Sequence, residues 1–139
     1  MPNYSKSAQL EQIALELMNE FDDLAHLDDE GLRIAYQYSD QEKKNRDMIV
    51  YADTEVVKEK YREFMPYEFL ITFYEPNCKD LDAEHLKRLM YHELKHVGFE
   101  GDSKFRVIPH NLEDFRECID KWGVDWIRSK GDGDGSEEQ

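Results

Sequence analysis

The chain has 139 residues, and its 18 Lys and Arg against 32 Asp and Glu give a formal net charge of −14. At this length we expect one domain whose core is large enough to fold without disulfide bonds. A content of 40% hydrophobic and 12% aromatic residues is typical of a folded chain rather than a disordered one. So acidic a surface repels phosphate groups, which argues against nucleic acids and anionic membranes as partners.

The sequence has no feature that directs a protein out of the cytoplasm. Its first residues are not followed by the apolar segment of a signal peptide, and no apolar stretch is long enough to span a membrane. Cys78 and Cys118 lie far apart and form no CxxC pair, so we expect two free thiols in a reducing compartment. We therefore expect a soluble, cytoplasmic protein.

Apolar periodicity predicts an amphipathic helix near the start of the chain, followed by several strands. Apolar residues spaced by three or four indicate a helix over residues 7–24, with Ser7 as its N-cap. Alternating or β-branched and aromatic runs indicate strands over residues 32–38, 48–52, 69–74 and 105–108. Of these, the run over 69–74 is the strongest strand signal in the chain.

Capping and breaking residues predict three further helices. They are a short helix from Asp53 or Thr54 to Phe64, one from Asp80 or Asp82 to about Val97 that stops at Gly98, and one that starts at Asn111 and ends at Gly123. This order of elements predicts an α+β domain with a small sheet. We place the domain at residues 8–128, after a flexible N-terminus (1–7) and before a disordered acidic, glycine-rich tail (129–139).

The informative motif is an HExxH sequence formed by His92, Glu93 and His96 on a predicted helix. Residues four apart lie on the same face of a helix, so two imidazoles at this spacing can bind one metal ion. The intervening glutamate can reach a metal-activated water and act as its general base. The apolar stripe of the helix lies on the same side as the histidines and directs them toward the protein body: Leu86, Leu89, Met90 and Val97.

A catalytic zinc site needs a third protein ligand. A metzincin would continue with glycine and histidine where this chain has Phe99 and Asp102, so that subclass is excluded. The next histidine is His110, directly before the helix that Asn111 is expected to cap. Acidic residues of that helix are substitute ligands, although Asp114 is better explained as a capping residue: Glu113, Asp114 and Glu117.

The chain resembles the family known as putative phage metallopeptidases. The resemblance rests on HELKHVG at 92–98, HNLEDF at 110–115 and WGVDW at 122–126, and it extends over residues 8–127 through the strand positions 34–36, 50–52 and 69–71. It implies a zincin-like fold, in which a short mixed sheet packs against the HExxH helix and flanking helices. It also implies one Zn²⁺ per chain, bound by His92, His96 and His110, with Glu93 catalytic.

One position departs from the family pattern, where Asp usually follows the third histidine and this chain has Asn111. Asn can still cap the helix and orient the ring of His110. A more distant similarity is to SprT-like and WLM-type peptidases, which often act with DNA-binding partners that the net charge of −14 does not favour here.

Other polar residues near the motif are candidates for a role at the site. His85 lies on the same helix face as His92 but about 10 Å away along the axis, too far to bind the same ion. Several side chains are candidates to stabilise an oxyanion, and the sequence does not choose among them: Tyr36, Tyr74, Tyr91, Lys95 and Arg106.

Two functions fit these features. The first is a zinc metallopeptidase that hydrolyses a protein or peptide substrate, with a strand at 69–74 as the sheet edge on which the substrate lies. The second is a non-catalytic, acidic, metal-stabilised binding or regulatory protein of phage or prophage origin. A peptidase with a single regulatory target is a variant of the first. Neither the substrate nor the oligomeric state follows from the sequence.

Overall fold

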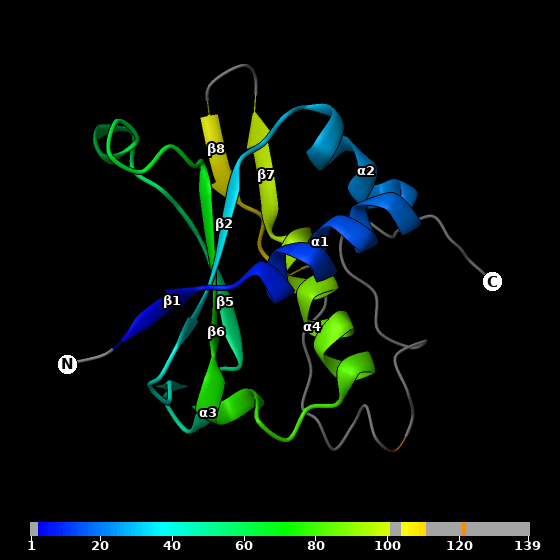
Figure 1. The fold of residues 1–139 in the computed structure, drawn as a ribbon, viewed down its shortest axis with the longest axis vertical. Helices are drawn as coiled ribbons and strands as arrows, with labels where there is room; N and C mark the ends of the chain where they lie inside the picture. The colour runs from blue at the N-terminus through cyan, green and yellow to red at the C-terminus, as the bar shows by residue number, and fades with distance from the viewer. Residues whose placement is uncertain (1–2, 101–103, 111–120, 122–139) are drawn as a thin grey trace. The chain divides into compact units, whose positions relative to one another are not determined.

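The structure is a computed structural model, which describes residues 3–100, 104–110 and 121 (Figure 1). By its internal contacts the chain divides into two compact units, residues 1–108 and 109–139. The first unit holds the strands β1 (Tyr4–Lys6), β2 (Ile34–Ser39), β3 (Lys44–Asn45), β4 (Met48–Ile49), β5 (Ala52–Val56), β6 (Phe69–Tyr74), β7 (Val97–Glu100) and β8 (Lys104–Val107). Its helices are α1 (Ala8–Glu20), α2 (Asp22–Asp29), α3 (Glu75–Cys78) and α4 (Ala83–Lys95), with a 3₁₀ turn at Glu59–Tyr61.

The main sheet has four strands in the order β1-β2-β6-β5. Strands β2 and β6 run parallel, with Ile34 opposite Phe69, and the two outer strands pair antiparallel to them. Two hairpins, β3–β4 and β7–β8, form separate two-stranded sheets. The prediction of an α+β fold with a short mixed sheet is therefore confirmed.

The core lies between the sheet and helices α1, α2 and α4, which Figure 1 shows on the same side of it. Strand β6 lies inside the sheet, and every second side chain faces the core, which gives three fully buried apolar residues: Phe69, Ile71 and Phe73. The helices contribute their apolar stripes, which include Leu10, Leu17, Met90 and Leu94.

The N-terminal helix is shorter than predicted, and a strand precedes it. Ser7 is the N-cap as predicted, since its Oγ accepts a hydrogen bond from the Leu10 N–H at 3.1 Å. The predicted helix over 7–24 is interrupted at Phe21, whose extended backbone (φ −113°, ψ 123°) separates α1 from α2. Tyr4–Lys6, within the segment expected to be flexible, pairs with β2 as strand β1.

The prediction of a helix from Asp53 or Thr54 to Phe64 is wrong. Ala52–Val56 is strand β5, and only Glu59–Tyr61 forms a single 3₁₀ turn. Thr54, Val56 and Val57 are β-branched, which favours an extended backbone, and the segment Ala52–Val56 pairs antiparallel with β6, whereas a short isolated helix is marginal. Strand β6 is accordingly a central strand, so the expectation that 69–74 forms the sheet edge is also wrong.

The HExxH helix is confirmed as α4, with Asp82 as the N-cap that accepts from the His85 N–H at 2.8 Å. The helix ends at Lys95, and Gly98 lies in β7 rather than at the helix terminus. The predicted strand at 105–108 corresponds to β8.

Some predictions lie outside the described residues. They concern the helix from Asn111 to Gly123, Cys118 and the tail over 129–139. Within the described part, Cys78 is a free, buried thiol, and no helix is long and apolar enough to cross a membrane.

Candidate metal centre

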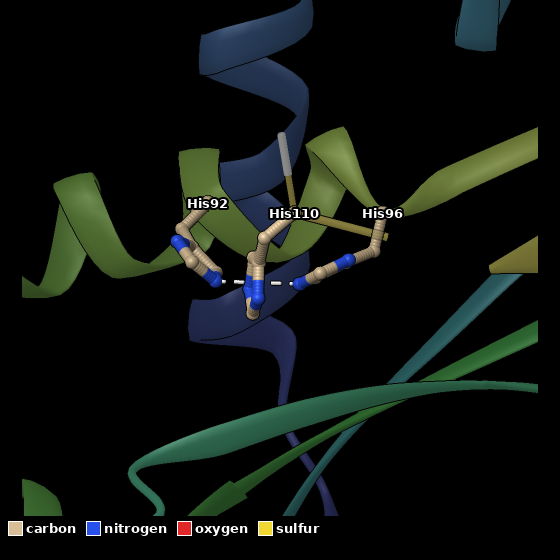
Figure 2. Close-up of side chains that lie close together, drawn as sticks. All are labelled: His92, His96 and His110. Carbon is tan, nitrogen blue, oxygen red and sulfur yellow. Dashed lines mark hydrogen bonds between the residues drawn. The ribbon is translucent and has the colours of Figure 1, made fainter. Parts of the chain in front are cut away.

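Helix α4 directs the rings of His92 and His96 toward each other (Figure 2). Their Nε2 atoms are 3.3 Å apart. Two nitrogens bound to one tetrahedral zinc ion at about 2.0–2.1 Å lie about 3.3–3.4 Å apart. The two rings therefore already hold the separation that a shared ion requires.

A main-chain contact orients the ring of His96. Its Nδ1 lies 2.6 Å from the carbonyl oxygen of Ile108, just after β8, and the Ile108 N–H donates to the carbonyl oxygen of His96 at 2.6 Å. Because a carbonyl oxygen only accepts, Nδ1 carries a proton in this contact, and the neutral form of the ring then presents the lone pair of Nε2. A metal-binding histidine commonly has such a partner on its other nitrogen.

Gly98 allows this contact. An added Cβ at Gly98 would lie 2.5 Å from Cδ1 and 2.6 Å from Cγ1 of Ile108, which is closer than carbon atoms can approach. The absence of a side chain at Gly98 therefore leaves room for Ile108, whose backbone contacts the backbone and the ring of His96.

His110 is the third histidine at this place. One ring nitrogen from each of His92, His96 and His110 lies within 4.8 Å of the others, and Figure 2 shows the three rings directed toward one another. His110 follows Ile108 by two residues, a stretch of chain that spans at most about 7 Å. Because Ile108 is hydrogen-bonded to His96, His110 is within reach by connectivity alone. The three histidines could together hold a metal ion.

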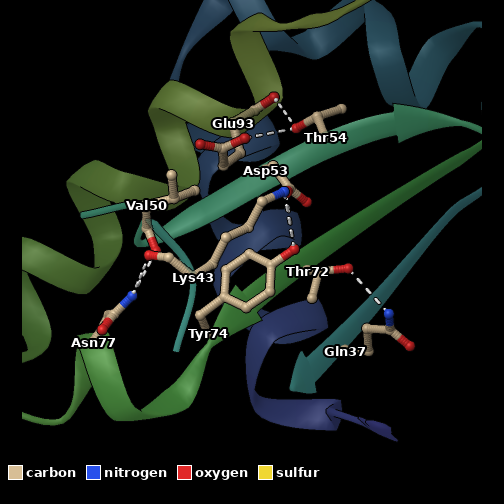
Figure 3. Close-up of polar contacts among 9 residues, drawn as sticks. All are labelled: Gln37, Lys43, Val50, Asp53, Thr54, Thr72, Tyr74, Asn77 and Glu93. Carbon is tan, nitrogen blue, oxygen red and sulfur yellow. Dashed lines mark hydrogen bonds and ion pairs between the residues drawn. The ribbon is translucent and has the colours of Figure 1, made fainter. Parts of the chain in front are cut away.

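Glu93 is buried beside the histidines, with 3% of its surface exposed. Its Oε1 accepts a hydrogen bond from Oγ1 of Thr54 on β5 at 2.8 Å (Figure 3). Its Oε2 is 4.0 Å from Nε2 of His92. Burial raises the pKa of the Glu93 carboxyl above its ordinary value, although the Thr54 hydrogen bond and the charge of His96 oppose this.

Most of the other side chains considered for a role at the site make contacts elsewhere. Nδ1 of His85 lies 2.6 Å from Oδ1 of Asp82, the N-cap residue of the same helix. Tyr91 and Lys95 both donate to Asp23 of α2, Tyr74 donates to Asp53 at 2.8 Å, and Tyr36 is buried in the core. Asn111 and Asp114, considered as a second-shell residue and an alternative ligand, lie outside the described residues.

Sequence reasoning missed two residues at this site, Thr54 and Ile108. The sequence predicts Asp53 or Thr54 as a helix cap, whereas the nearby β-branched residues Val56 and Val57 are the signal for a strand. Nothing in the sequence marks the carbonyl of Ile108, because it is the backbone that makes the contact.

The fold and the site together define an α+β protein with a candidate metal centre of three histidines beside a buried glutamate. The chain belongs to the family described as "Putative phage metallopeptidase", whose pattern matches residues 2–130. The resemblance seen in the sequence is thereby confirmed. No curated protein and no solved structure matches the chain.

Proposed function

We propose that this protein is a zinc-dependent peptidase of zincin-like architecture, in which His92, His96 and His110 bind the metal and Glu93 is the general base. The observation that carries the proposal is the position of the Glu93 carboxylate. Its Oε2 lies 4.0 Å from Nε2 of His92, and that nitrogen lies 3.3 Å from Nε2 of His96. Membership of a metallopeptidase family supports it.

The donor set fits zinc. Imidazole nitrogens are good zinc ligands, and three of them leave the fourth tetrahedral position open, as catalytic sites require. Zinc at this place would polarise a carbonyl and lower the pKa of water toward about 7. Glu93 is not needed as a ligand, because the three histidines already supply the three protein ligands of a catalytic site.

Glu93 transfers the proton of the attacking water. As a carboxylate it removes a proton from the water that attacks the scissile carbonyl, and it then gives that proton to the leaving nitrogen. Burial suits it to this role, because a carboxylate whose pKa is raised is a stronger base than an ordinary glutamate.

Strand β5, rather than β6, is the edge on which we propose that an extended substrate lies. Within the described residues β5 is hydrogen-bonded to another strand on one side alone, although β8 also contacts it without pairing. The Tyr74 N–H donates to the carbonyl oxygen of Tyr51, and the Val57 N–H donates to that of Glu68. The odd-numbered residues from 51 to 57 therefore direct their backbone groups toward β6. In an antiparallel ladder the alternate residues Ala52, Thr54 and Val56 then turn their backbone groups outward, where a peptide can pair with them.

The alternative is a non-catalytic, metal-stabilised binding or regulatory protein of phage or prophage origin. The net charge of −14 favours it, because an acidic surface of this size attracts basic partners. In either case we propose a protein or peptide partner, and neither nucleic acid nor a membrane.

Cleavage of unselected peptides tests the proposal. The zinc-loaded wild type and Glu93→Gln are incubated with a large mixture of synthetic peptides, and new termini are counted by mass spectrometry. We expect zinc-dependent cleavage by the wild type and at least about a 100-fold loss in Glu93→Gln. Equal numbers of new termini in the two samples would favour the binding protein.

A further inference from the structure

We infer that Thr54 is a positioning residue that assigns different roles to the two oxygens of the Glu93 carboxylate. The inference rests on the proposed function. It adds a residue of strand β5 to the site formed by the HExxH motif. It starts from the contacts of one hydroxyl group (Figure 3).

The Oγ1 of Thr54 is within hydrogen-bond distance of two acceptors on the same residue. It lies 2.8 Å from Oε1 and 3.1 Å from the main-chain oxygen of Glu93. That main-chain oxygen also accepts from the His96 N–H at 3.1 Å in the last turn of α4. The single hydroxyl proton of Thr54 can reach either acceptor, of which Oε1 is the nearer, so Thr54 contacts both the side chain of Glu93 and the backbone turn that connects it to His96.

The contact makes the two carboxylate oxygens unequal. Oε1 is held by the hydroxyl group, whereas Oε2 points to the metal side, 4.0 Å from Nε2 of His92. Without the hydroxyl group, the carboxylate could rotate about its last bond and exchange the two oxygens. Thr54 thus fixes Oε2 as the oxygen that meets the reacting water.

Thr54 lies on β5, the strand on which we propose that the substrate lies, so the residue that orients Glu93 also belongs to the substrate-binding edge. Thr54 is one of the residues whose backbone groups face away from β6, so an extended peptide would pair with the residue that orients Glu93. Its side chain lies on the same face as those of Ala52 and Val56, which pack against the core. One residue would then contact the peptide backbone and the general base together.

A small zinc-directed inhibitor measures the orientation of Glu93 without a substrate. Acetohydroxamate binds zinc through its two oxygens and needs a neighbouring carboxylate to accept its proton. Its dissociation constant is measured by calorimetry for the zinc-loaded wild type, Thr54→Val, Thr54→Ser and Glu93→Gln. Thr72→Val is the matched control, because Thr72 is buried in the neighbouring strand β6 and its hydroxyl accepts from Gln37 at 3.0 Å.

We expect all variants to bind zinc like the wild type. Thr54→Val should weaken acetohydroxamate binding by about 10- to 100-fold, as expected for loss of a residue that orients a catalytic group. Thr54→Ser should restore it, and Thr72→Val should leave it unchanged. If Thr54→Val does not fold, Thr54→Ala gives the same comparison.

Two results would overturn the inference. One is wild-type affinity in Thr54→Val while Glu93→Gln is impaired, and the other is equal impairment in Thr72→Val, which would indicate a general effect on the sheet. Failure of the proposed function looks different: the wild type then binds no zinc, or Glu93→Gln binds the inhibitor as well as the wild type does.

Discussion

The carbonyl oxygen of Ile108 lies 2.6 Å from Nδ1 of His96, and the side chain of Ile108 occupies the space where Gly98 lacks a Cβ. The contact joins the segment after β8 to the end of α4. It orients an imidazole whose other nitrogen faces His92. The backbone around the candidate metal centre therefore contributes to the orientation of its histidines.

Replacement of Gly98 by alanine should weaken metal binding. The new Cβ would lie 2.5 Å from Cδ1 of Ile108, so Ile108 must shift, and we expect the shift to disturb the contact of its carbonyl with His96. We expect a loss of zinc affinity of about 10- to 100-fold, as for other contacts that orient a metal-binding histidine. Competition with a chromophoric chelator measures this affinity.

Gly31 provides the matched control for this glycine. It has φ +68°, a conformation that favours glycine, but nothing lies within 4 Å of an added Cβ. Gly31→Ala should therefore lower the free energy of unfolding by about 1 kcal/mol and leave zinc affinity unchanged. A zinc affinity equally reduced in both variants would contradict the role assigned to Gly98.

Zinc should stabilise the folded protein by mass action. At a free zinc concentration of about 100 times the dissociation constant, the free energy of unfolding should rise by about 2.7 kcal/mol. His92→Ala should abolish this gain, whereas His85→Ala should keep it, because His85 contacts Asp82 rather than the centre. Urea unfolding with and without zinc gives both values, and a gain retained in His92→Ala would exclude this histidine as a ligand.

Acid should destabilise the protein partly through Glu68. Burial disfavours its charged form, but the hydrogen bonds and charge of Arg33 outweigh this and hold the pKa of the Glu68 carboxyl below its ordinary value of 4.5. A lowered pKa contributes stability above pH 4.5, and this contribution is lost as the pH falls through the folded-state pKa.

The variant Glu68→Gln should therefore be less stable than the wild type at pH 7, by about 1–2 kcal/mol. The difference should shrink as the pH falls below about 4.5. Unfolding measured at several pH values tests this expectation. The exposed Glu63 is the control, and Glu63→Gln should follow the wild-type profile.

The N-cap of α1 should also contribute measurably to stability. Ser7→Ala removes the acceptor of the Leu10 N–H and should cost about 1 kcal/mol of unfolding free energy. Ser5→Ala, at an exposed position in β1, should cost less. Thermal unfolding of the two variants makes the comparison, and equal losses would show that the cap contributes nothing.

Local patterns predicted the parts of the fold that depend on local physics. The run over 69–74 coincides with β6, and the HExxH spacing placed His92 and His96 on one helix face. The failure at β5 has a physical cause. Val56, Val57 and Tyr61 also fit a helical spacing, and only pairing with β6 decides in favour of a strand.

The site was predictable in its motif but not in its supporting contacts. His92, Glu93, His96 and His110 could be chosen because their chemistry is visible in the sequence. The contact of Thr54 with Glu93 joins residues 39 positions apart, and it depends on which strand lies beside α4. Such a relationship is a property of the tertiary structure and leaves no local signal.

Metal content per chain tests the central claim most directly. The wild type, His110→Ala and Glu93→Gln are purified, loaded with zinc, dialysed and measured by elemental analysis. We expect about one zinc ion per chain in the wild type and in Glu93→Gln, and far less in His110→Ala. A wild type that retains no zinc after it is added back would contradict the account, as would a Glu93→Gln variant that loses its zinc.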